Sequence, residues 1–287
     1  MTPKTLDWTR ADDILIDPQS DPKPCPPEAA PAIESCVHAV RNSRARGAGV
    51  ILMYGAHLLR NGAARILDRM MERRWLTHVA TNGAGTIHDW EYAWLGRSTE
   101  SVEQNVATGT FGAWDETGRN LHLALLAGAL RGEGYGASLG RFITEDGTDF
   151  PAPESLENAI RDDPQHPLTP ARADLLQTML RHRIRSGRAR VEHNWKQASI
   201  LASAFRHGIP ATVHPGIGYD ITLSSREPSS GAPPGSTSGS SVILSRLSTV
   251  GSSSLSAPPS WPLRSSRRAS VASIISGSPP DALSSRT

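Results

Sequence analysis

Short apolar runs alternate with helical periods along the first 221 residues of the chain. Residues 49–55 are an apolar run between glycines, which is typical of a buried parallel strand. Leu58–Arg74 has the spacing of an amphipathic helix, and residues 76–80 form a second apolar run. Residues 81–85 predict a tight glycine turn, from which a helix over residues 86–95 follows. This order predicts an α/β fold with a Rossmann-like parallel sheet and helices on both faces.

The second half of this region continues the same alternation. Residues 209–214 predict a third strand, and residues 151–170, rich in proline, predict a surface connection. Further helices are predicted at Glu34–Ser43, Leu121–Ala129, Gly136–Thr144, Ala171–Arg185 and Gln197–His207. We therefore expect an N-terminal arm and helix over residues 1–45 and a folded domain over residues 46–221.

The pattern stops near Thr222. Serine makes up about a third of the residues from Leu223 to Thr287, and Trp261 is the only aromatic residue there. So few large apolar groups cannot offset the entropy lost on ordering a chain. We therefore expect residues 222–287 to form a disordered Ser/Pro-rich tail, which leaves the C-terminal part of the fold incomplete.

Two explanations compete for this tail: a natural low-complexity segment and translation in a shifted reading frame. The absence of Lys, His, Asn and Gln favours the shifted frame, because natural tails usually keep some of them. Moving the frame back by one base turns TC-type serine codons into codons for Val, Leu, Ile or Phe. Residues 250–261 would then read as an apolar, glycine-punctuated strand.

Composition narrows the classes of function. The net charge is +2, and the arginines of residues 41–46 and 181–190 are typical of solvated helix faces, so we expect no nucleic-acid partner. Cys25 and Cys36 could form at most one bridge. The first eight residues lack the apolar core of a signal peptide, and no apolar run reaches the length of a membrane span. We expect a soluble cytoplasmic protein.

We look for candidate functional residues where the three predicted strands end, because open parallel sheets bind ligands at their carboxyl edge. The three segments are residues 55–57, 81–89 and 214–220, and each places glycine beside a polar side chain. Glycines let backbone N–H groups approach a phosphate, and a helix start favours an anion. The alternative for the second segment is a plain strand-to-helix turn. Candidate ligand-binding residues are His57, Asn82, Gly83, Ala84, Gly85, Asp89, Gly216 and Gly218.

Three other side chains are candidates for catalysis. His88 lies beside a carboxylate and could act as an oriented base, or be a surface residue near a helix start. His214 and Asp220 flank a Gly-x-Gly turn, where Asp220 could hold a ribose hydroxyl or an amine, or merely cap the turn. The spacing of the histidines does not predict a metal site.

Taken together, residues 54–62, 77–89 and 208–220 resemble the deoxyhypusine synthase-like proteins, closest to a bacterial branch with an Asn-Gly-Ala-Gly-x-Ile-His-Asp stretch. The resemblance implies an NAD-binding domain over residues 46–221, in a homotetramer with sites between subunits. It implies oxidation of a polyamine by NAD and transfer of its aminobutyl group, through an enzyme-lysine imine, to a protein lysine or a diamine.

The chain departs from this family at two places. Ile87 and His88 stand where the family has paired acids, and the family's late imine-forming lysine has no counterpart in the tail. Lys196 is the remaining candidate in the folded region, although its position is typical of a helix start or a surface residue. Two functions therefore lead: an NAD-dependent aminobutyl transferase, or a nucleotide-binding protein of the same fold that lacks that chemistry or has a different one. A metal-dependent hydrolase built on His88, Asp89 and His214 is a distant third.

Overall fold

The computed structural model describes residues 9–22, 24–98, 106–109 and 115–216. The predicted tail, Gly218 and Asp220 lie outside these residues. The helices are α1 (Ala11–Ile14), α2 (Ala30–Ala45), α3 (Ala56–Arg60), α4 (Ala64–Glu72), α5 (Gly83–Leu95), α7 (Asp115–Ala129), α8 (Tyr135–Thr144), α9 (Pro153–Asp162), α10 (Thr169–His182), the short 3-10 helix η1 (Lys196–Ala198) and α11 (Ile200–Arg206). The strands are β1 (Ile51–Met53), β2 (His78–Thr81), β3 (Gly147–Phe150), β4 (Gly187–Arg190) and β5 (Ala211–Val213).

The three strands predicted from the apolar runs form one parallel sheet in the order β1-β2-β5. Met53 pairs with Ala80, and Thr81 pairs with Val213, so β2 is the central strand. The described part of the chain is thus a mixed helix and strand structure with a small parallel sheet, as predicted.

Only one face of this sheet joins the hydrophobic clusters of the described residues. Leu52 and Val79 pack in one cluster, and Val213 packs in another. On the opposite face, Ile51 and Met53 are 59% and 62% exposed. The prediction that β1 is buried is therefore wrong for the described residues. Helices on both faces of the sheet are not confirmed, since Ile51 and Met53 lie outside the hydrophobic clusters.

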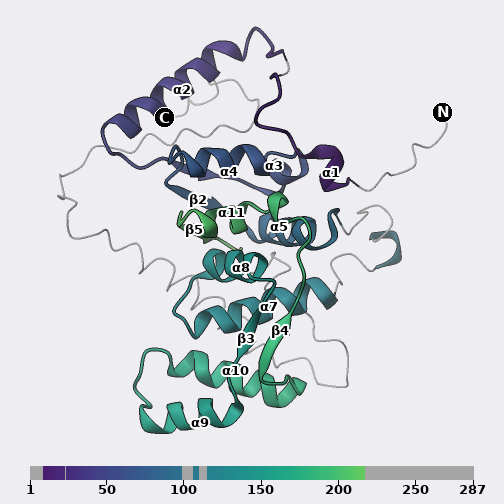
Figure 1. The fold of residues 1–287 in the computed structure, drawn as a ribbon, viewed down its shortest axis with the longest axis vertical. Helices are drawn as coiled ribbons and strands as arrows, with labels where there is room; N and C mark the ends of the chain where they lie inside the picture. The colour runs from purple at the N-terminus through teal and green to yellow at the C-terminus, as the bar shows by residue number, and fades with distance from the viewer. Residues whose placement is uncertain (1–8, 23, 99–105, 110–114, 217–287) are drawn as a thin grey trace, which may run out of the picture.

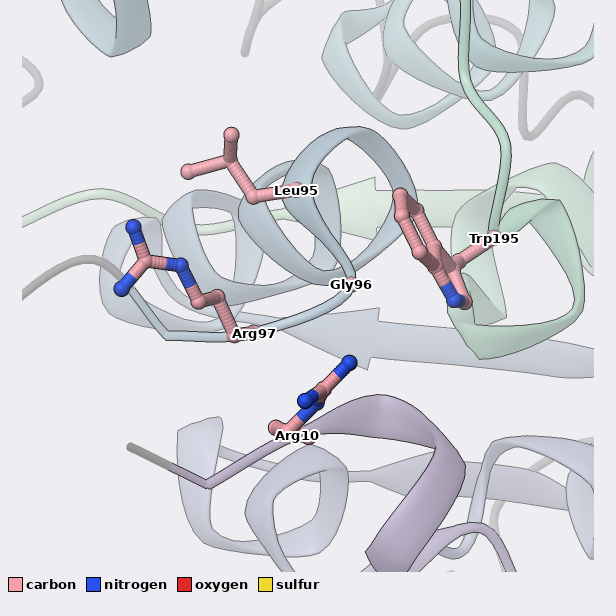
Figure 2. A pocket seen from close by; sticks show the side chains of 5 residues that line it. All are labelled: Arg10, Leu95, Gly96, Arg97 and Trp195. Atoms are coloured by element: carbon pink, nitrogen blue, oxygen red, sulfur yellow. The ribbon is translucent and has the colours of Figure 1, made fainter. Parts of the chain in front are cut away.

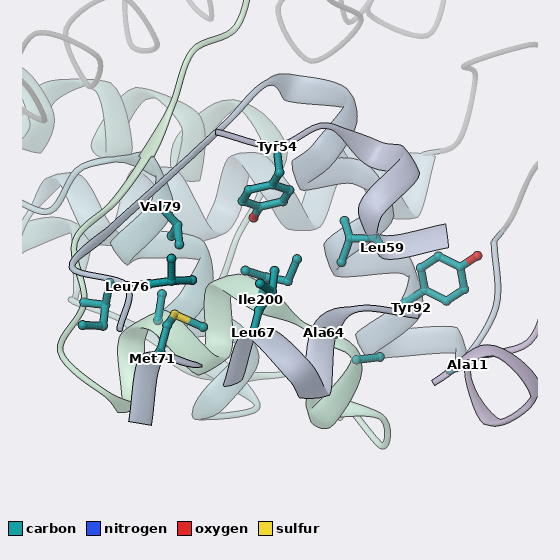
Figure 3. Close-up of a cluster of buried hydrophobic side chains, with 13 residues drawn as sticks. Ala11, Tyr54, Leu59, Ala64, Leu67, Met71, Leu76, Val79, Tyr92 and Ile200 are labelled. Carbon is teal, nitrogen blue, oxygen red and sulfur yellow. The ribbon is translucent and has the colours of Figure 1, made fainter. Parts of the chain in front are cut away.

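One hydrophobic core lies between the sheet and the helices α4 and α11 (Figure 3). Leu67 and Met71 of α4 meet Val79 of β2 and Ile200 of α11 there. The N-terminal arm belongs to the same core, since Ala11 is completely buried in it. The arm is therefore packed against the sheet domain at this point.

A second part of the molecule extends away from the sheet through α8 and α7 to α9 and α10, at the opposite end from α2 (Figure 1). Its two-stranded antiparallel sheet joins β3 to β4, and Arg188 Nη1 lies 2.9 Å from Asp149 Oδ2 across it. Sequence analysis missed both strands and placed residues 187–190 on a helix face. Each strand is short and rich in polar residues, so neither shows an apolar period.

Several helices and their bounds also differ from the prediction. The helix expected over Leu58–Arg74 is two helices, because Gly62 adopts a positive φ of 74° between α3 and α4. A Cβ at Gly62 would overlap the carbonyl group of Ile14. Helix α9 occupies the expected surface connection, and its Pro153 lies in the first turn, where proline is well tolerated. Helix α5 begins at Gly83, so the expected glycine turn is its first turn.

Candidate functional site

The carboxyl ends of β1, β2 and β5 lie at one edge of the sheet, as the sequence predicted. The pairing continues one residue past the strands on both sides of β2. Tyr54 N donates to Ala80 O at 2.9 Å, and His214 N donates to Thr81 O at 2.8 Å. The segments that begin at Gly55, Asn82 and His214 therefore leave the sheet side by side, and we call this place the carboxyl edge.

Asn82 turns the chain from β2 into α5. Its backbone is extended, and its side chain accepts a hydrogen bond from Gly85 N at 2.9 Å, which is the usual N-cap arrangement. The N–H groups of Gly83 and Ala84 meet no acceptor among the described residues. Asn82 and Ala84 are exposed. The start of this 13-residue helix therefore has two backbone N–H groups without an acceptor among the described residues, one at the buried Gly83 and one at the exposed Ala84, with the positive end of the helix dipole behind them.

Gly85 has a packing role at the same turn. A Cβ there would overlap the hydroxyl oxygen of Thr81, whose Oγ1 donates to Tyr54 O at 3.0 Å. The missing side chain lets α5 lie against β2. Thr86 holds the turn from the other side, because its Oγ1 donates to Gly83 O at 2.7 Å and lies 3.1 Å from the hydroxyl of Tyr135 on α8.

Two histidines from the other strands stand at the carboxyl edge. His57 is exposed in the first turn of α3. His214 is also exposed, and its Nε2 lies 2.9 Å from Thr212 Oγ1, which lies 3.0 Å from His78 Nε2. Burial, followed by the charge of His214, lowers the pKa of His78. The hydroxyl of Thr212 thus links two imidazoles on the open face of the sheet. Gly216 follows as the last described residue.

His88 lies further along α5, about 8 Å from Gly83 along the helix axis at 1.5 Å per residue. Its Nδ1 is 3.1 Å from Glu91 Oε2, and its ring lies 6.5 Å from that of Tyr92. His88 keeps a partner carboxylate, as predicted, but that carboxylate is Glu91 and not the neighbouring Asp89.

Asp89 has a structural role in place of the expected ligand contact. Its side chain is completely buried and faces the start of α11. One carboxylate oxygen accepts from Ile200 N at 2.7 Å and from Leu201 N at 3.4 Å, and the other accepts from the Ser199 hydroxyl. Burial raises the pKa of Asp89 to about 7, although these three hydrogen bonds act in the opposite direction. Asp89 therefore caps α11 and is closed to a ligand.

Lys196 is the only lysine among the described residues, and it is engaged elsewhere. Its Nζ lies 2.6 Å from Asp146 Oδ2 and donates to Thr144 O at 3.0 Å. It begins η1, which agrees with the helix-start interpretation. Sequence reasoning had no signal for this contact, because the two partners are 50 residues apart.

Within the described ranges, no group of three or more His, Cys, Asp or Glu side chains is placed to hold a metal ion. No helix in the same ranges is long and apolar enough to cross a membrane. Scans of the chain against protein-family models and against curated proteins find no match.

Proposed function

We propose that this chain binds NAD at the carboxyl edge, as the cofactor-binding part of a Rossmann-like, deoxyhypusine synthase-like transferase of aminobutyl groups from polyamines. The observation that carries the proposal is the pair of N–H groups of Gly83 and Ala84 at the start of α5. A pyrophosphate is an anion with several acceptor oxygens, and such groups bind at helix starts that follow a parallel strand. The small, exposed Ala84 leaves room for it.

The neighbouring segments supply the other roles in this proposal. His57 and Gly216, on the segments that follow β1 and β5 at the same edge of the sheet, would contact the cofactor, and His214 or His88 would handle protons. Asp220, outside the described residues, would hold a ribose hydroxyl or a substrate amine. NAD, when bound, supplies the hydride acceptor. The acceptor of the aminobutyl group would be a diamine or a protein lysine, and the protein would act as a cytoplasmic homo-oligomer.

The variant Ala84→Glu tests the cofactor site. A carboxylate in the first turn favours the helix dipole, so the variant should unfold at the same or a slightly higher temperature. The same carboxylate would repel a pyrophosphate, so we expect NADH to bind at least tenfold more weakly. NADH fluorescence titration and thermal unfolding measure the two effects.

The matched control is Ala32→Glu, an exposed alanine in the first turn of α2, which should leave NADH binding unchanged. Equal NADH affinity of the wild-type chain and Ala84→Glu would contradict the proposed site. So would the absence of NADH binding to the wild-type chain at millimolar concentration.

Binding without group transfer is the second candidate, and the position of Lys196 favours it. The ammonium group of Lys196 is held by Asp146 and Thr144, and imine formation needs a free, neutral amine. If this candidate is right, the chain binds NADH but forms no aminobutyl product from spermidine and putrescine. Product analysis by mass spectrometry separates the two candidates.

A further inference from the structure

Helix α2 is the longest helix of the described residues, and none of its 16 residues is buried. It lies at one end of the molecule (Figure 1), and none of its residues belongs to the hydrophobic clusters of the described chain. A helix of this length is only marginally stable on its own in water, and most helices in proteins are stabilised by the packing of one apolar face. Within the described residues, α2 therefore lacks the packing that such a helix needs.

The chain is fixed to the sheet domain on both sides of α2. Before the helix, the N-terminal arm is anchored at the end of α5, where Ala11 N donates to Gly96 O at 2.6 Å. The packing there is close, because a Cβ at Gly96 would overlap the indole ring of Trp195, which stands next to it in Figure 2. After the helix, Val50 N donates to Thr77 Oγ1 at 2.8 Å. Helix α2 is therefore tethered to the domain at both ends.

The large apolar residues of α2 lie along one face. At about 100° of rotation per residue, Ile33, Val37 and Val40 fall within about 60° of one another. Ile33 and Val37 are 51% and 41% exposed, and Val40 is partly exposed. Arg44 continues the same line, but its Nη1 donates to Ala48 O at 2.8 Å, so the stripe ends at Val40. Two turns of α2 thus carry an exposed apolar stripe.

One flank of this stripe carries two opposite charges. Glu34 and Arg41 lie on the same side of the stripe, about 80–100° around the helix from Ile33. Both are exposed, and neither has an ion pair with another described residue. They are about 10 Å apart along the helix axis, so they do not pair within one helix. A partner that fits this face needs a positive charge opposite Glu34 and a negative charge opposite Arg41.

We propose that α2 is a dimerisation helix, whose apolar stripe packs antiparallel against the same stripe of a second copy of this chain. Like flanks face each other in an antiparallel helix pair around a two-fold axis. An axis near Val37 therefore places Glu34 opposite Arg41 of the partner subunit, and Arg41 opposite Glu34 of the partner subunit. The stripe and its charged flank are thus complementary to themselves.

This inference does not depend on the cofactor site, and it names the surface for the homo-oligomer that the proposed function expects. Two turns of apolar contact are small beside a standard interface of about 1,600 Å², so we expect a dimer that dissociates on dilution in the micromolar range. The other occupant that would fit the stripe is a segment of the same chain outside the described residues. That occupant predicts a monomer, so the two differ in the mass of the protein in solution.

Analytical ultracentrifugation of the full chain tests the proposal. We expect a dimer, and Val37→Glu should raise its dissociation constant at least tenfold, because two carboxylates would meet at the two-fold axis in place of an apolar contact. The matched control is Ala39→Glu, which adds the same charge at an exposed position on the opposite face of α2 and should dimerise as the wild-type chain does. Circular dichroism should show that both variants are folded, since both positions are exposed.

Charge reversal tests the pairing of Glu34 with Arg41. Glu34→Arg and Arg41→Glu each place like charges opposite each other at two symmetric positions, and each should raise the dissociation constant by about fivefold. The double variant exchanges the two signs and should restore the wild-type affinity. A mere loss of helix stability would not be rescued in this way.

Cys36 allows a test by cross-linking. It is a free, partly exposed thiol on the other flank of the stripe, about 60° around the helix from Ile33. The proposed axis near Val37 brings the two copies of Cys36 to nearly the same level. A short bis-maleimide should therefore cross-link Cys25→Ser, which keeps Cys36, into a dimer, and should fail with Cys36→Ser.

Three results would overturn the proposal. A wild-type chain that is monomeric at about 100 micromolar excludes the dimer, and slow amide exchange along α2 in that monomer assigns the stripe to a segment of the same chain. A dimer that survives Val37→Glu places the homo-oligomer on another surface, and a double charge reversal without rescue excludes the antiparallel pairing. NADH titration of Ala39→Glu reports the cofactor site separately, whatever the mass of the protein.

Discussion

At the scale of single residues, Asp89 joins the candidate site to the rest of the core. Its carboxylate lies between α5, which begins at the carboxyl edge, and the N–H groups that open α11. No cation is among the groups that shift the pKa of Asp89. Burial, and after it the charge of Asp89, raises the pKa of the Tyr54 phenol. The ionised form of Asp89 is therefore costly to bury.

This environment predicts an unusual pH dependence of stability. The pKa of Asp89 is about 7 in the folded chain and near 3.8 in the unfolded chain, so the folded chain holds the extra proton between these values. Its contribution to stability is complete below pH 4 and is lost as the pH rises through 7. Asp89→Asn, which keeps an acceptor for Ile200 N, should remove this dependence and stabilise the chain at pH 8 by a few kcal/mol.

Urea unfolding at pH 5 and pH 8 measures the effect, with the exposed Asp21→Asn as control. The difference in unfolding free energy between the two pH values should shrink in Asp89→Asn and persist in Asp21→Asn. An unchanged difference in Asp89→Asn would show that Asp89 titrates at its ordinary pKa in the folded chain.

At the scale of elements, the contact between α5 and β2 depends on Gly85. Its replacement by alanine would push a methyl group into the Thr81 hydroxyl, so Gly85→Ala should lower the unfolding free energy by about 1–3 kcal/mol. Gly118→Ala on α7 is the matched control, because nothing lies within 4 Å of its added Cβ. That variant should be stabilising by about 0.5–1 kcal/mol.

Combining Gly85→Ala with Thr81→Ala should restore part of the loss, since the second change removes the oxygen that the methyl group meets. Thermal and denaturant unfolding of the wild-type chain, the two single variants and the double variant measures the coupling. If the losses in unfolding free energy of the two single variants simply add, Gly85 is not needed for the close approach of α5 to β2.

The elements that sequence predicted well are those with a clear apolar period. The three parallel strands and helices α2, α8 and α10 lie where the pattern placed them to within a few residues. The strands β3 and β4 were not predicted, because their pairing joins segments about forty residues apart and no apolar run marks either strand. Helix α9 was not predicted, because a proline such as Pro153 is typical of loops as well as of the first turn of a helix.

The candidate site was predictable in its position and less so in its members. Strand ends and glycines located the carboxyl edge, because parallel strands end at the same side of a sheet. The burial of Asp89 and the engagement of Lys196 depend on contacts over 110 and 50 residues of sequence, which no local pattern records.

At the scale of the whole molecule, the described residues form two regions that are built from different elements. The sheet, α4, α5 and α11 form one packed unit, and α9 and α10 form the other end (Figure 1). One sheet face keeps Ile51 and Met53 exposed. The proposed chemistry therefore depends on a single edge of a three-stranded sheet, and its anion site is the start of α5.

The most direct test follows the backbone amide signals of the isotope-labelled chain by NMR while NAD is added. Donation from the first turn of α5 to a pyrophosphate predicts the largest shifts at Gly83 and Ala84, with smaller shifts at His57 and His214. Unchanged signals at Gly83 and Ala84 while NAD binds elsewhere, or no shifts anywhere at millimolar NAD, would contradict a dinucleotide site at this edge.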